Sequence, residues 1–292
     1  MELQKLHKDE GSIVVGFAES RIGGRSENQD SFGAMYTSRG FLVTVCDGMG
    51  GGPGGKTASS IAVNEILTGI NEGASDETVT NVIIKAVRRA NMAIIEAGNE
   101  NPELKGMGST ATVLLVSDQS AFIAHVGDSR VYQFRKKKRV FRTMDHSMVY
   151  DLVRQKVITE EQARLSAQSN VITRALGMRP DIEVELHEVA FKKGDRFLLC
   201  TDGIHGSMPE RDLIKMAANP SKALGAITDD IATCVDNLGR SDGGGHDNLT
   251  IAMVETLTNS SIKIKMSDKE KFFYLVLVLA CIIGIILLFV YK

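Results

Sequence analysis

Apolar residues along the chain fall into short runs between glycines and turn residues, and into longer segments with helical spacing. Short β-branched or aromatic runs bounded by turn signals are typical of strands. They predict strands at residues 13–18, 41–46, 110–116, 121–126, 131–134, 140–142, 183–189, 196–200 and 249–254. Apolar residues that recur every three or four positions predict helices at residues 57–70, 77–97, 147–155, 160–167, 209–217 and 221–238.

Turn and cap residues refine this pattern. Ser75 is expected to cap the helix at 77–97, and Thr159 with Gln162 forms a capping box for a later helix. Two hairpins are expected. One joins the strands at 110–116 and 121–126, and the other turns at the basic tip 135–139. Strands come mostly in adjacent pairs, with helices grouped between the pairs. This order favours antiparallel sheets covered by helices, an α+β fold with room for two sheets.

The last part of the chain has a different composition. Residues 272–291 carry no charged side chain, and at about 1.5 Å per residue such a helix would be about 30 Å long, enough to cross a bilayer. A buried core helix is the alternative, but core helices seldom lack every polar residue. Residues 259–271 are polar and lysine-rich, whereas only Lys292 follows the apolar run. The positive-inside rule therefore predicts a cytoplasmic domain at 1–258, a basic juxtamembrane linker at 259–271 and a transmembrane helix at 272–291.

Composition and cysteine spacing narrow the classes of function. The chain has 292 residues, of which 43% are hydrophobic and 24% charged, as in globular proteins. Its formal net charge of -2 gives no reason to expect a nucleic-acid partner. The four cysteines include no C-x-x-C pair, which argues against the common zinc sites and a disulfide framework. Cys46 and Cys200 are expected to be buried, reduced thiols, and the polar N-terminus lacks the apolar core of a signal peptide.

Five aspartates share a setting that suggests a metal site. Each lies close to glycine or asparagine, at the edge of an apolar strand. They are Asp30, Asp47, Asp128, Asp202 and Asp247. Carboxylates gathered at one rim of a sheet repel one another unless a cation neutralises them, and hard oxygen ligands favour Mg²⁺ or Mn²⁺ over zinc. The alternative is that each is an ordinary turn aspartate.

One arginine stands close to this set in the sequence. Arg25 precedes Asp30 by five residues in the stretch GRSENQD. A planar, permanently charged guanidinium beside a divalent metal site would suit a phosphate dianion. A surface salt bridge is the alternative.

Eight stretches of sequence give a more specific indication. In chain order they are GRSENQDS, VCDGMGG, GMGSTATVLL, AHVGDSRVY, DHSMVYDLV, NVITRALG, GDRFLLCTDG and GGHDNLT. Together they resemble the ordered motifs of the protein phosphatase type 2C (PPM) family, and of its bacterial branch in particular. The resemblance extends over about residues 12–256.

The resemblance implies a fold, an activity and a role for each site residue. The implied fold is a four-layer α/β/β/α sandwich of two antiparallel sheets flanked by helices. The implied activity is hydrolysis of phosphoserine and phosphothreonine by a metal-activated water at two Mn²⁺ or Mg²⁺ ions, with a third, weaker ion. The implied metal-binding positions are Asp47, the Gly48 carbonyl, Asp202, Asp247 and, for the third ion, Asp128. Asp30 is expected to act through metal-bound water, and Arg25 to clamp the substrate phosphate.

Several positions depart from the family pattern. Many eukaryotic members carry a histidine after Asp-Gly where this chain has Met49, which leaves the proton donor unassigned. The other departures are Gly52, Lys56, Gly206, Ser166 and Ala167. They put metal affinity and substrate choice in question without removing an expected metal ligand. His205 and His246 lie beside expected ligands and could assist proton transfer, with a structural role as the alternative.

The sequence thus predicts a signalling phosphatase at the cytoplasmic face of the cell membrane. Its expected partners are phosphorylated proteins, an opposing serine/threonine kinase and the membrane, but no nucleic acid, and the chain is expected to be a monomer. Two alternatives stay open. One is a catalytically silent, membrane-tethered adaptor that binds phosphoproteins, and the other is a phosphatase dedicated to a single regulatory partner.

Overall fold

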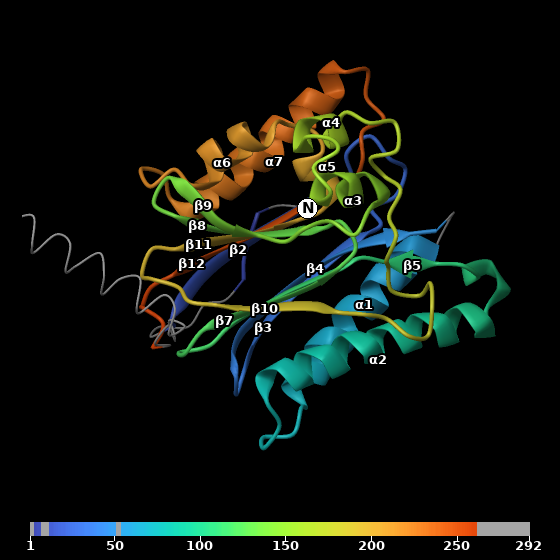
Figure 1. The fold of residues 1–292 in the computed structure, drawn as a ribbon, viewed down its shortest axis with the longest axis horizontal. Helices are drawn as coiled ribbons and strands as arrows, with labels where there is room; N and C mark the ends of the chain where they lie inside the picture. Colours follow the sequence, from blue (N-terminus) through green and yellow to red (C-terminus); the bar gives the residue numbers. More distant parts are fainter. Residues whose placement is uncertain (1–2, 7–11, 51–53, 262–292) are drawn as a thin grey trace, which may run out of the picture. The chain divides into compact units, whose positions relative to one another are not determined.

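The computed structural model describes residues 3–6, 12–50 and 54–261. Residues 1–260 form one compact unit. In this unit two antiparallel sheets lie face to face, and helices cover both outer faces (Figure 1). The expected sandwich of two antiparallel sheets flanked by helices is therefore confirmed.

The two sheets each bring together strands from distant parts of the chain. The first has the order β1-β2-β12-β11-β8-β9, and the second has the order β10-β7-β6-β4-β3, with β5 attached to β4. The strands of the first sheet are β1 (Gln4–Lys5), β2 (Val14–Arg21), β8 (Arg130–Arg135), β9 (Lys138–Arg142), β11 (Arg196–Cys200) and β12 (Leu249–Thr256). Those of the second are β3 (Asp30–Thr37), β4 (Gly40–Met49), β5 (Gly108–Ser109), β6 (Ala111–Val116), β7 (Ala121–Val126) and β10 (Glu185–Val189).

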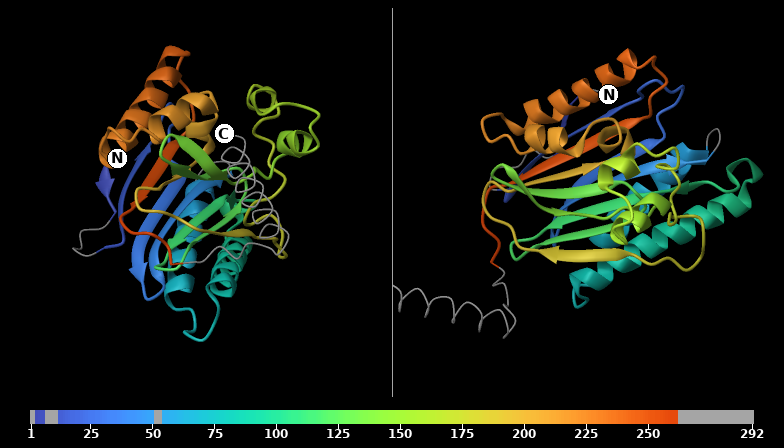
Figure 2. Two further views of the ribbon diagram at one scale, coloured as in Figure 1. Left: turned by 60° about the vertical axis from the view of Figure 1, so that its left-hand side comes forward. Right: turned by 45° about the horizontal axis from the view of Figure 1, so that its top comes forward.

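Two helix pairs form the outer layers. The long helices α1 (Gly54–Asn71) and α2 (Val79–Glu100) cover the second sheet, and α6 (Glu210–Ala217) with α7 (Leu224–Ser241) covers the first, as both views in Figure 2 show. Shorter helices lie near one end of the strands. They are the 3-10 helix η1 (Pro102–Leu104), α3 (Met148–Arg154), α4 (Glu160–Arg164) and α5 (Asp202–His205).

Apolar side chains fill each interface between layers. The core between the sheets includes Phe41 of β4, Ile123 of β7 and Phe197 of β11, none of which is exposed. Burying a side chain of this size contributes about 1.5–3 kcal/mol. Separate cores lie under α1 and α2 and under α6 and α7. Because the central strands are buried on both faces, they have continuous apolar runs, which is why the sequence predicts them well.

Strand β3 is one element that the apolar pattern does not predict. It lies at the edge of the second sheet and pairs only with β4 among the described strands. All its residues except Asp30 are partly exposed, so it has no continuous apolar run. Because β3 is an edge strand, the apolar pattern misses it, although the strand begins with a candidate site residue, Asp30.

Helix ends show where local sequence signals succeed and fail. The capping box of Thr159 and Gln162 is confirmed at the start of α4. The cap expected at Ser75 is wrong, because α2 begins at Val79 and the Thr78 side chain accepts a hydrogen bond from the Asn81 N–H at 3.3 Å. Thr78 satisfies the same rule for helix starts one turn later than the prediction.

The expected transmembrane helix at 272–291 lies outside the described residues, as does most of the linker expected at 259–271. Within 3–6, 12–50 and 54–261, no helix is both long and apolar enough to cross a bilayer. The membrane anchor therefore stays a prediction from sequence.

Candidate active site

All five candidate aspartates lie at the same end of the sandwich. Asp30 begins β3 and stands directly opposite Asp47 of β4 in the strand register. Asp202 follows the end of β11, Asp247 precedes the start of β12, and Asp128 precedes the start of β8. Since Cys200 pairs with both Ile251 and Arg130, these three segments also meet at one end of the first sheet. This placement agrees with the expectation that strand ends gather the carboxylates.

A hydrogen bond across the two sheets joins the aspartates into one group. Thr201 directly follows strand β11 of the first sheet. Its hydroxyl donates to Oδ2 of Asp30, which begins strand β3 of the second sheet, at 3.0 Å. The backbone N–H of Asp47 donates to Thr110 Oγ1 at 2.8 Å, which fixes the end of β4. Asp128 is 6% exposed and its carbonyl accepts a hydrogen bond from His205 Nε2 at 3.0 Å.

The electrostatics of this group favour a bound cation. Burial, together with the charges of neighbouring aspartates, raises the pKa of Asp30 to about 7 and that of Asp202 to about 6. Burial and the same mutual repulsion raise the pKa values of Asp47 and Asp128 well above their usual range. Such shifts mean that burial, and to a smaller extent mutual repulsion, destabilises the ionised carboxylates in the metal-free chain.

Two buried carboxylate oxygens supply a direct test of whether a metal fits. Asp30 Oδ1 and Asp202 Oδ1 have no hydrogen-bond partner among the described residues. A buried carboxylate oxygen without a partner is costly; a divalent cation would satisfy Asp202 Oδ1, and a water molecule would satisfy Asp30 Oδ1. Together with the carboxylates of Asp47 and Asp247 at the same end of the sandwich, Asp202 forms an oxygen-ligand set that fits hard divalent ions such as Mn²⁺ or Mg²⁺.

Gly48 lies in the tightest part of this site. A Cβ atom on Gly48 would lie 1.9 Å from the Gly55 carbonyl oxygen and 2.7 Å from that of Gln29. Only glycine fits between these two backbone segments. The position expected to offer a carbonyl to a metal is thus held rigidly at the end of β4, next to the start of α1.

Arg25 stands at the rim of the site, as expected for a group that meets a substrate phosphate. Its Nη2 lies 2.9 Å from Asp247 Oδ2, and the two side chains are 52% and 40% exposed. Asn248 holds the Arg25 loop in place, since its side-chain amide donates to the carbonyls of Ile22 and Glu27 at 2.8 and 2.9 Å. The sequence analysis assigns no role to Asn248, although it belongs to the motif GGHDNLT.

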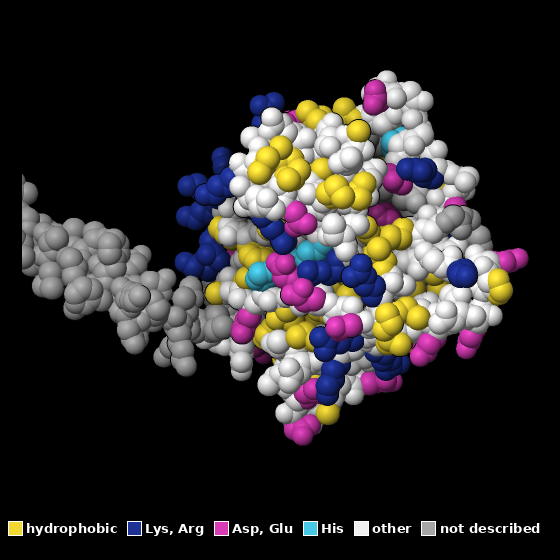
Figure 3. Space-filling view, turned by 45° about the vertical axis from the view of Figure 1, so that its right-hand side comes forward, with side chains coloured by type: hydrophobic (Ala, Val, Ile, Leu, Met, Phe, Trp, Pro, Cys, Tyr) yellow, Lys and Arg dark blue, Asp and Glu magenta, His cyan; other side chains and the backbone are white. Residues whose placement is uncertain are grey.

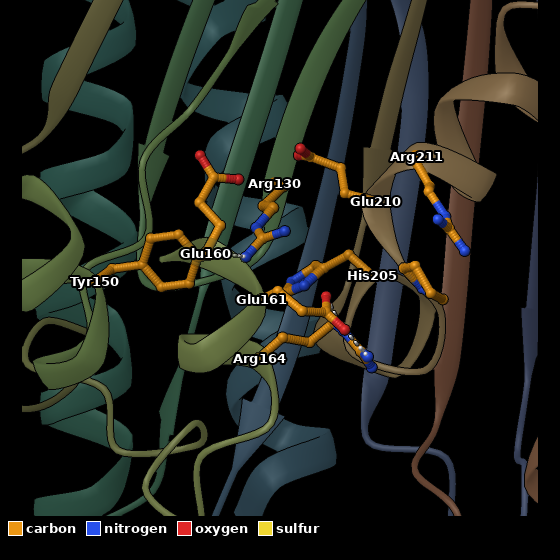
Figure 4. A pocket seen from close by; sticks show the side chains of 9 residues that line it. Arg130, Tyr150, Glu160, Glu161, Arg164, His205, Glu210 and Arg211 are labelled. Carbon is orange, nitrogen blue, oxygen red and sulfur yellow. Dashed lines mark hydrogen bonds and ion pairs between the residues drawn. The ribbon is translucent and has the colours of Figure 1, made fainter. Parts of the chain in front are cut away.

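A cavity of about 290 Å³ opens beside the aspartates. Arg25, Asp202 and Asp247 line one part of it, and Arg164 and Asn170 line another. A second cavity of about 390 Å³ adjoins it and shares several lining residues. In Figure 4 the α4 side chains Glu160, Glu161 and Arg164 line that second cavity opposite Glu210 and Arg211 of α6.

Arg164 is a site residue that the sequence analysis does not single out. Its Nη1 donates to the carbonyl oxygen of Gly206 at 3.1 Å, and its other nitrogens bind Glu161 (Figure 4). Gly206 is one of the positions where the sequence departs from the pattern of the resemblance. Here this position is joined to α4 through its backbone. No local sequence signal marks the contact, because the two residues are far apart in the chain.

Lys56, another departure from the family pattern, contacts the site from α1. Its Nζ donates to the Asp30 carbonyl at 2.8 Å and to Ser31 Oγ at 3.1 Å. Gly52 lies outside the described residues. Lys56 therefore fixes the start of β3 and places a cation close to the aspartates.

The two histidines beside the aspartates make structural hydrogen bonds. His205 is buried, which lowers its pKa to about 3, and its Nε2 bonds to the Asp128 carbonyl. His246 Nε2 bonds to Asp236 Oδ1 at 2.9 Å, and its ring packs against Gly239 of α7. These contacts favour the structural role that the sequence analysis leaves open for both.

A separate group of His125, His146 and Glu185 has ligand atoms within 4.8 Å of one another. Its hydrogen bonds do not favour a metal. His146 Nδ1 accepts from the Gly127 N–H at 3.1 Å, so the proton of its neutral ring is on Nε2, which faces Glu185 at 3.2 Å. A metal at Nε2 would require this proton to leave. The group is better explained as a buried hydrogen-bond network.

Comparison with known proteins identifies similar chains. A family model described as protein phosphatase 2C matches residues 19–234. The serine/threonine phosphatase stp of Listeria innocua is 30% identical over 235 residues, covering 79% of this chain and 91% of that protein. The crystal structure of Stp1 from Staphylococcus aureus has a TM-score of 0.76 at 26% identity, over 85% of this chain and 97% of that one. The catalytic domain of PstP, solved in complex with two manganese ions, has a TM-score of 0.69 at 27% identity, over 84% of this chain and 98% of that one.

The family match covers most of the compact unit, and the fold and the clustered aspartates agree with it. The expectation drawn from the eight sequence stretches is confirmed at the level of the family. The chain belongs to the protein phosphatase 2C family and is a metal-dependent serine/threonine phosphatase of the bacterial type.

Proposed function

We propose that this chain hydrolyses phosphoserine and phosphothreonine in proteins at a centre formed by Asp47, Gly48, Asp202 and Asp247, with Asp128 holding a third ion. The observation that carries the proposal is the group of aspartates, two of which have a buried oxygen without a partner, beside Arg25 and an open cavity. Mn²⁺ or Mg²⁺ ions bound there would supply Lewis-acid activation of the attacking water.

The chain's own side chains provide orientation and charge. Arg25 is half exposed, so its guanidinium can turn from Asp247 towards the phosphate oxygens of a substrate and make paired hydrogen bonds. Thr201 holds the Asp30 carboxylate through Oδ2, which leaves Oδ1 available to accept a hydrogen bond from water. The cavity lined by Arg164 and Asn170 would receive the peptide around the phosphorylated residue.

The test is phosphate release from phosphothreonine and phosphoserine peptides by the purified full chain, with Mn²⁺, with Mg²⁺ and with a chelator. Asp202→Asn is the matched variant, since it keeps the side-chain shape and removes the charge. We expect metal-dependent turnover that this variant loses by at least about 100-fold. A folded protein without turnover under either metal would instead support the adaptor alternative.

We further propose that the enzyme works at the cytoplasmic face of the cell membrane, opposite a serine/threonine kinase that phosphorylates its substrates. The uncharged run at 272–291 and the lysines at 259–271 support this location. Membrane fractionation of cells that express the full chain or residues 1–260 tests it. Recovery of both proteins in the soluble fraction would contradict the proposal.

A further inference from the structure

Five exposed lysines lie in two turns that catalysis does not use. Lys136, Lys137 and Lys138 lie at the β8–β9 hairpin, and Lys192 and Lys193 lie between β10 and β11. None of the five has an ion-pair partner within residues 12–50 and 54–261. We call these five residues the lysine end.

Hydrogen bonds between the turns hold the lysine end together. The Arg135 guanidinium binds both oxygens of Asp195, at distances from 2.6 to 3.1 Å, and the Lys192 N–H donates to Asp195 Oδ2 at 3.0 Å. Asp195 is only 1% exposed. Because Arg135 already neutralises this buried acid, Asp195 offsets little of the positive charge of the lysines.

The compact unit of the chain also ends here. The Gly194 N–H donates to the Thr256 carbonyl at 2.7 Å, and the Lys193 N–H donates to Asn259 Oδ1 at 3.0 Å. The Ser260 N–H donates to the Phe191 carbonyl at 3.1 Å. The last residues of the compact unit are therefore bonded directly to one of the two lysine turns, and the sequence continues with further lysines.

The lysine end and the aspartates lie at opposite ends of the same strands. Strand β12 begins next to Asp247 and ends at Thr256, beside Gly194. Its eight residues span about 25 Å at roughly 3.3 Å per residue. A partner bound at the lysine end would leave the catalytic cavity open.

The positive charge is confined to one half of this end. In the other sheet, Asp118 lies in the β6–β7 turn, and Glu188 near the end of β10 accepts a hydrogen bond from Ser120 Oγ of that turn at 2.6 Å. Figure 3 shows Lys and Arg side chains gathered at one edge of the molecule, while the rest of that face mixes both signs. The charge is therefore local and does not reflect a basic protein, in line with the net charge of -2.

We propose that the lysine end binds an anionic lipid surface and turns the catalytic cavity away from it. Lysine ammonium groups are strongly hydrated point charges on flexible stems, which suit a diffuse field of lipid headgroups better than one rigid ligand. This inference adds an orientation to the proposed membrane location, and it concerns residues that hydrolysis does not need.

The test uses residues 1–260, so that no other segment can bind lipid. This part forms one compact unit, and the solved relatives match it over 97–98% of their own length, so it is expected to fold alone. Flotation with vesicles of phosphatidylcholine and phosphatidylglycerol is compared with flotation on phosphatidylcholine alone. We expect binding only to the anionic vesicles, and weaker binding as salt rises.

Two matched variants remove the same amount of positive charge. The test variant is K137Q/K138Q/K192Q/K193Q, which keeps Lys136 because its backbone φ is positive. The control is K5Q/K85Q/R88Q/K105Q, at exposed positions elsewhere. Since each basic side chain near an anionic surface contributes roughly fivefold, the test variant should bind at least about 100-fold more weakly and the control within about threefold of the parent.

Three binding results would overturn the proposal. They are equal binding to neutral vesicles, an equal loss of binding in both variants, and tighter lysine-dependent binding to duplex nucleic acid than to lipid. Hydrogen exchange on vesicles should protect amides near Lys137 and Lys193, and protection near Asn170 and Gly206 instead would contradict the orientation. The Tm of each variant, measured by thermal unfolding, checks its fold. Flotation does not depend on turnover, so a failure of the proposed hydrolysis would be distinguishable from a failure of the proposed lipid binding.

Discussion

Neutralising Asp30 should stabilise the metal-free protein at alkaline pH. The ordinary pKa of an aspartate is 3.8, whereas burial and its charged neighbours raise that of Asp30 to about 7 in the folded chain. The folded state therefore holds this proton more tightly than the unfolded state does. It follows that stability falls as pH rises from about 4 to about 7, and stays low above that range.

The size of the effect follows from the two pKa values. A change from 3.8 to about 7 corresponds to about 4 kcal/mol, which is an upper bound because neighbouring aspartates titrate together with Asp30. Asp30→Asn removes the titration. The new amide can still accept the Thr201 hydrogen bond and can donate to a neighbouring carboxylate. If half of this upper bound is realised, the Tm of Asp30→Asn at pH 8 should exceed that of the parent by about 4–8 °C.

The assay is thermal unfolding in the presence of chelator at pH 5 and pH 8, for the parent and for Asp30→Asn. Burial lowers the pKa values of His146 to about 4 and of His205 to about 3. These histidines destabilise the fold as pH falls below about 6.5, which opposes the effect of Asp30. Both proteins contain them, so the difference between the two Tm profiles removes the contribution of the histidines and reports Asp30 together with the aspartates that titrate with it.

Asp145→Asn is the control substitution of the same chemistry. Burial alone would raise the pKa of Asp145, but Arg130 holds it below its ordinary value. This variant should therefore lose stability at pH 8, in contrast to Asp30→Asn. The reasoning is refuted if Asp30→Asn is no more stable than the parent at pH 8, or if its advantage is as large at pH 5.

Three further changes test other parts of the structure. Arg25→Ala should lower kcat/KM on a phosphopeptide by about 100-fold while leaving Tm unchanged, and a loss below threefold would exclude it as a phosphate ligand. Arg130→Met leaves a buried Asp145 unpaired and should cost about 3–5 kcal/mol in urea unfolding, most of which Arg130→Met/Asp145→Leu should recover. Gly24→Ala places a Cβ 2.3 Å from the Gly245 backbone nitrogen, so metal-dependent turnover should fall at least tenfold, and normal turnover would show that this loop can shift.

The sequence predicts the buried parts of the fold better than its edges. Central strands such as β6, β7 and β11 have continuous apolar runs because both of their faces are buried. The edge strand β3 lacks such a run and is missed. Sheet membership is not local information either. β10 and β11 are adjacent in sequence and joined by a turn, yet they belong to different sheets.

The candidate site likewise has features that the sequence predicts and features that it does not. Strand-end placement of the aspartates and the ordered motifs predict from the sequence that Asp47, Asp202 and Asp247 lie together, and the structure places them at one end of the sandwich. The hydrogen bond between Arg164 and Gly206 joins α4 to α5, and no spacing in the sequence predicts it. The same holds for the unpartnered oxygens, since burial of individual atoms depends on how the two sheets pack.

The aspartates belong to two different layers of the molecule, so a metal bound between them would also have a mechanical role. Asp30 and Asp47 extend from the second sheet, whereas Asp202 and Asp247 extend from the first. Among the described contacts at this end, the Thr201–Asp30 hydrogen bond bridges the sheets while the carboxylates repel one another. An ion bound by carboxylates of both sheets would link the two sheets to each other. Loss of metal would then weaken the contact between the layers as well as the chemistry, so removal of metal should lower the thermal stability of the folded enzyme.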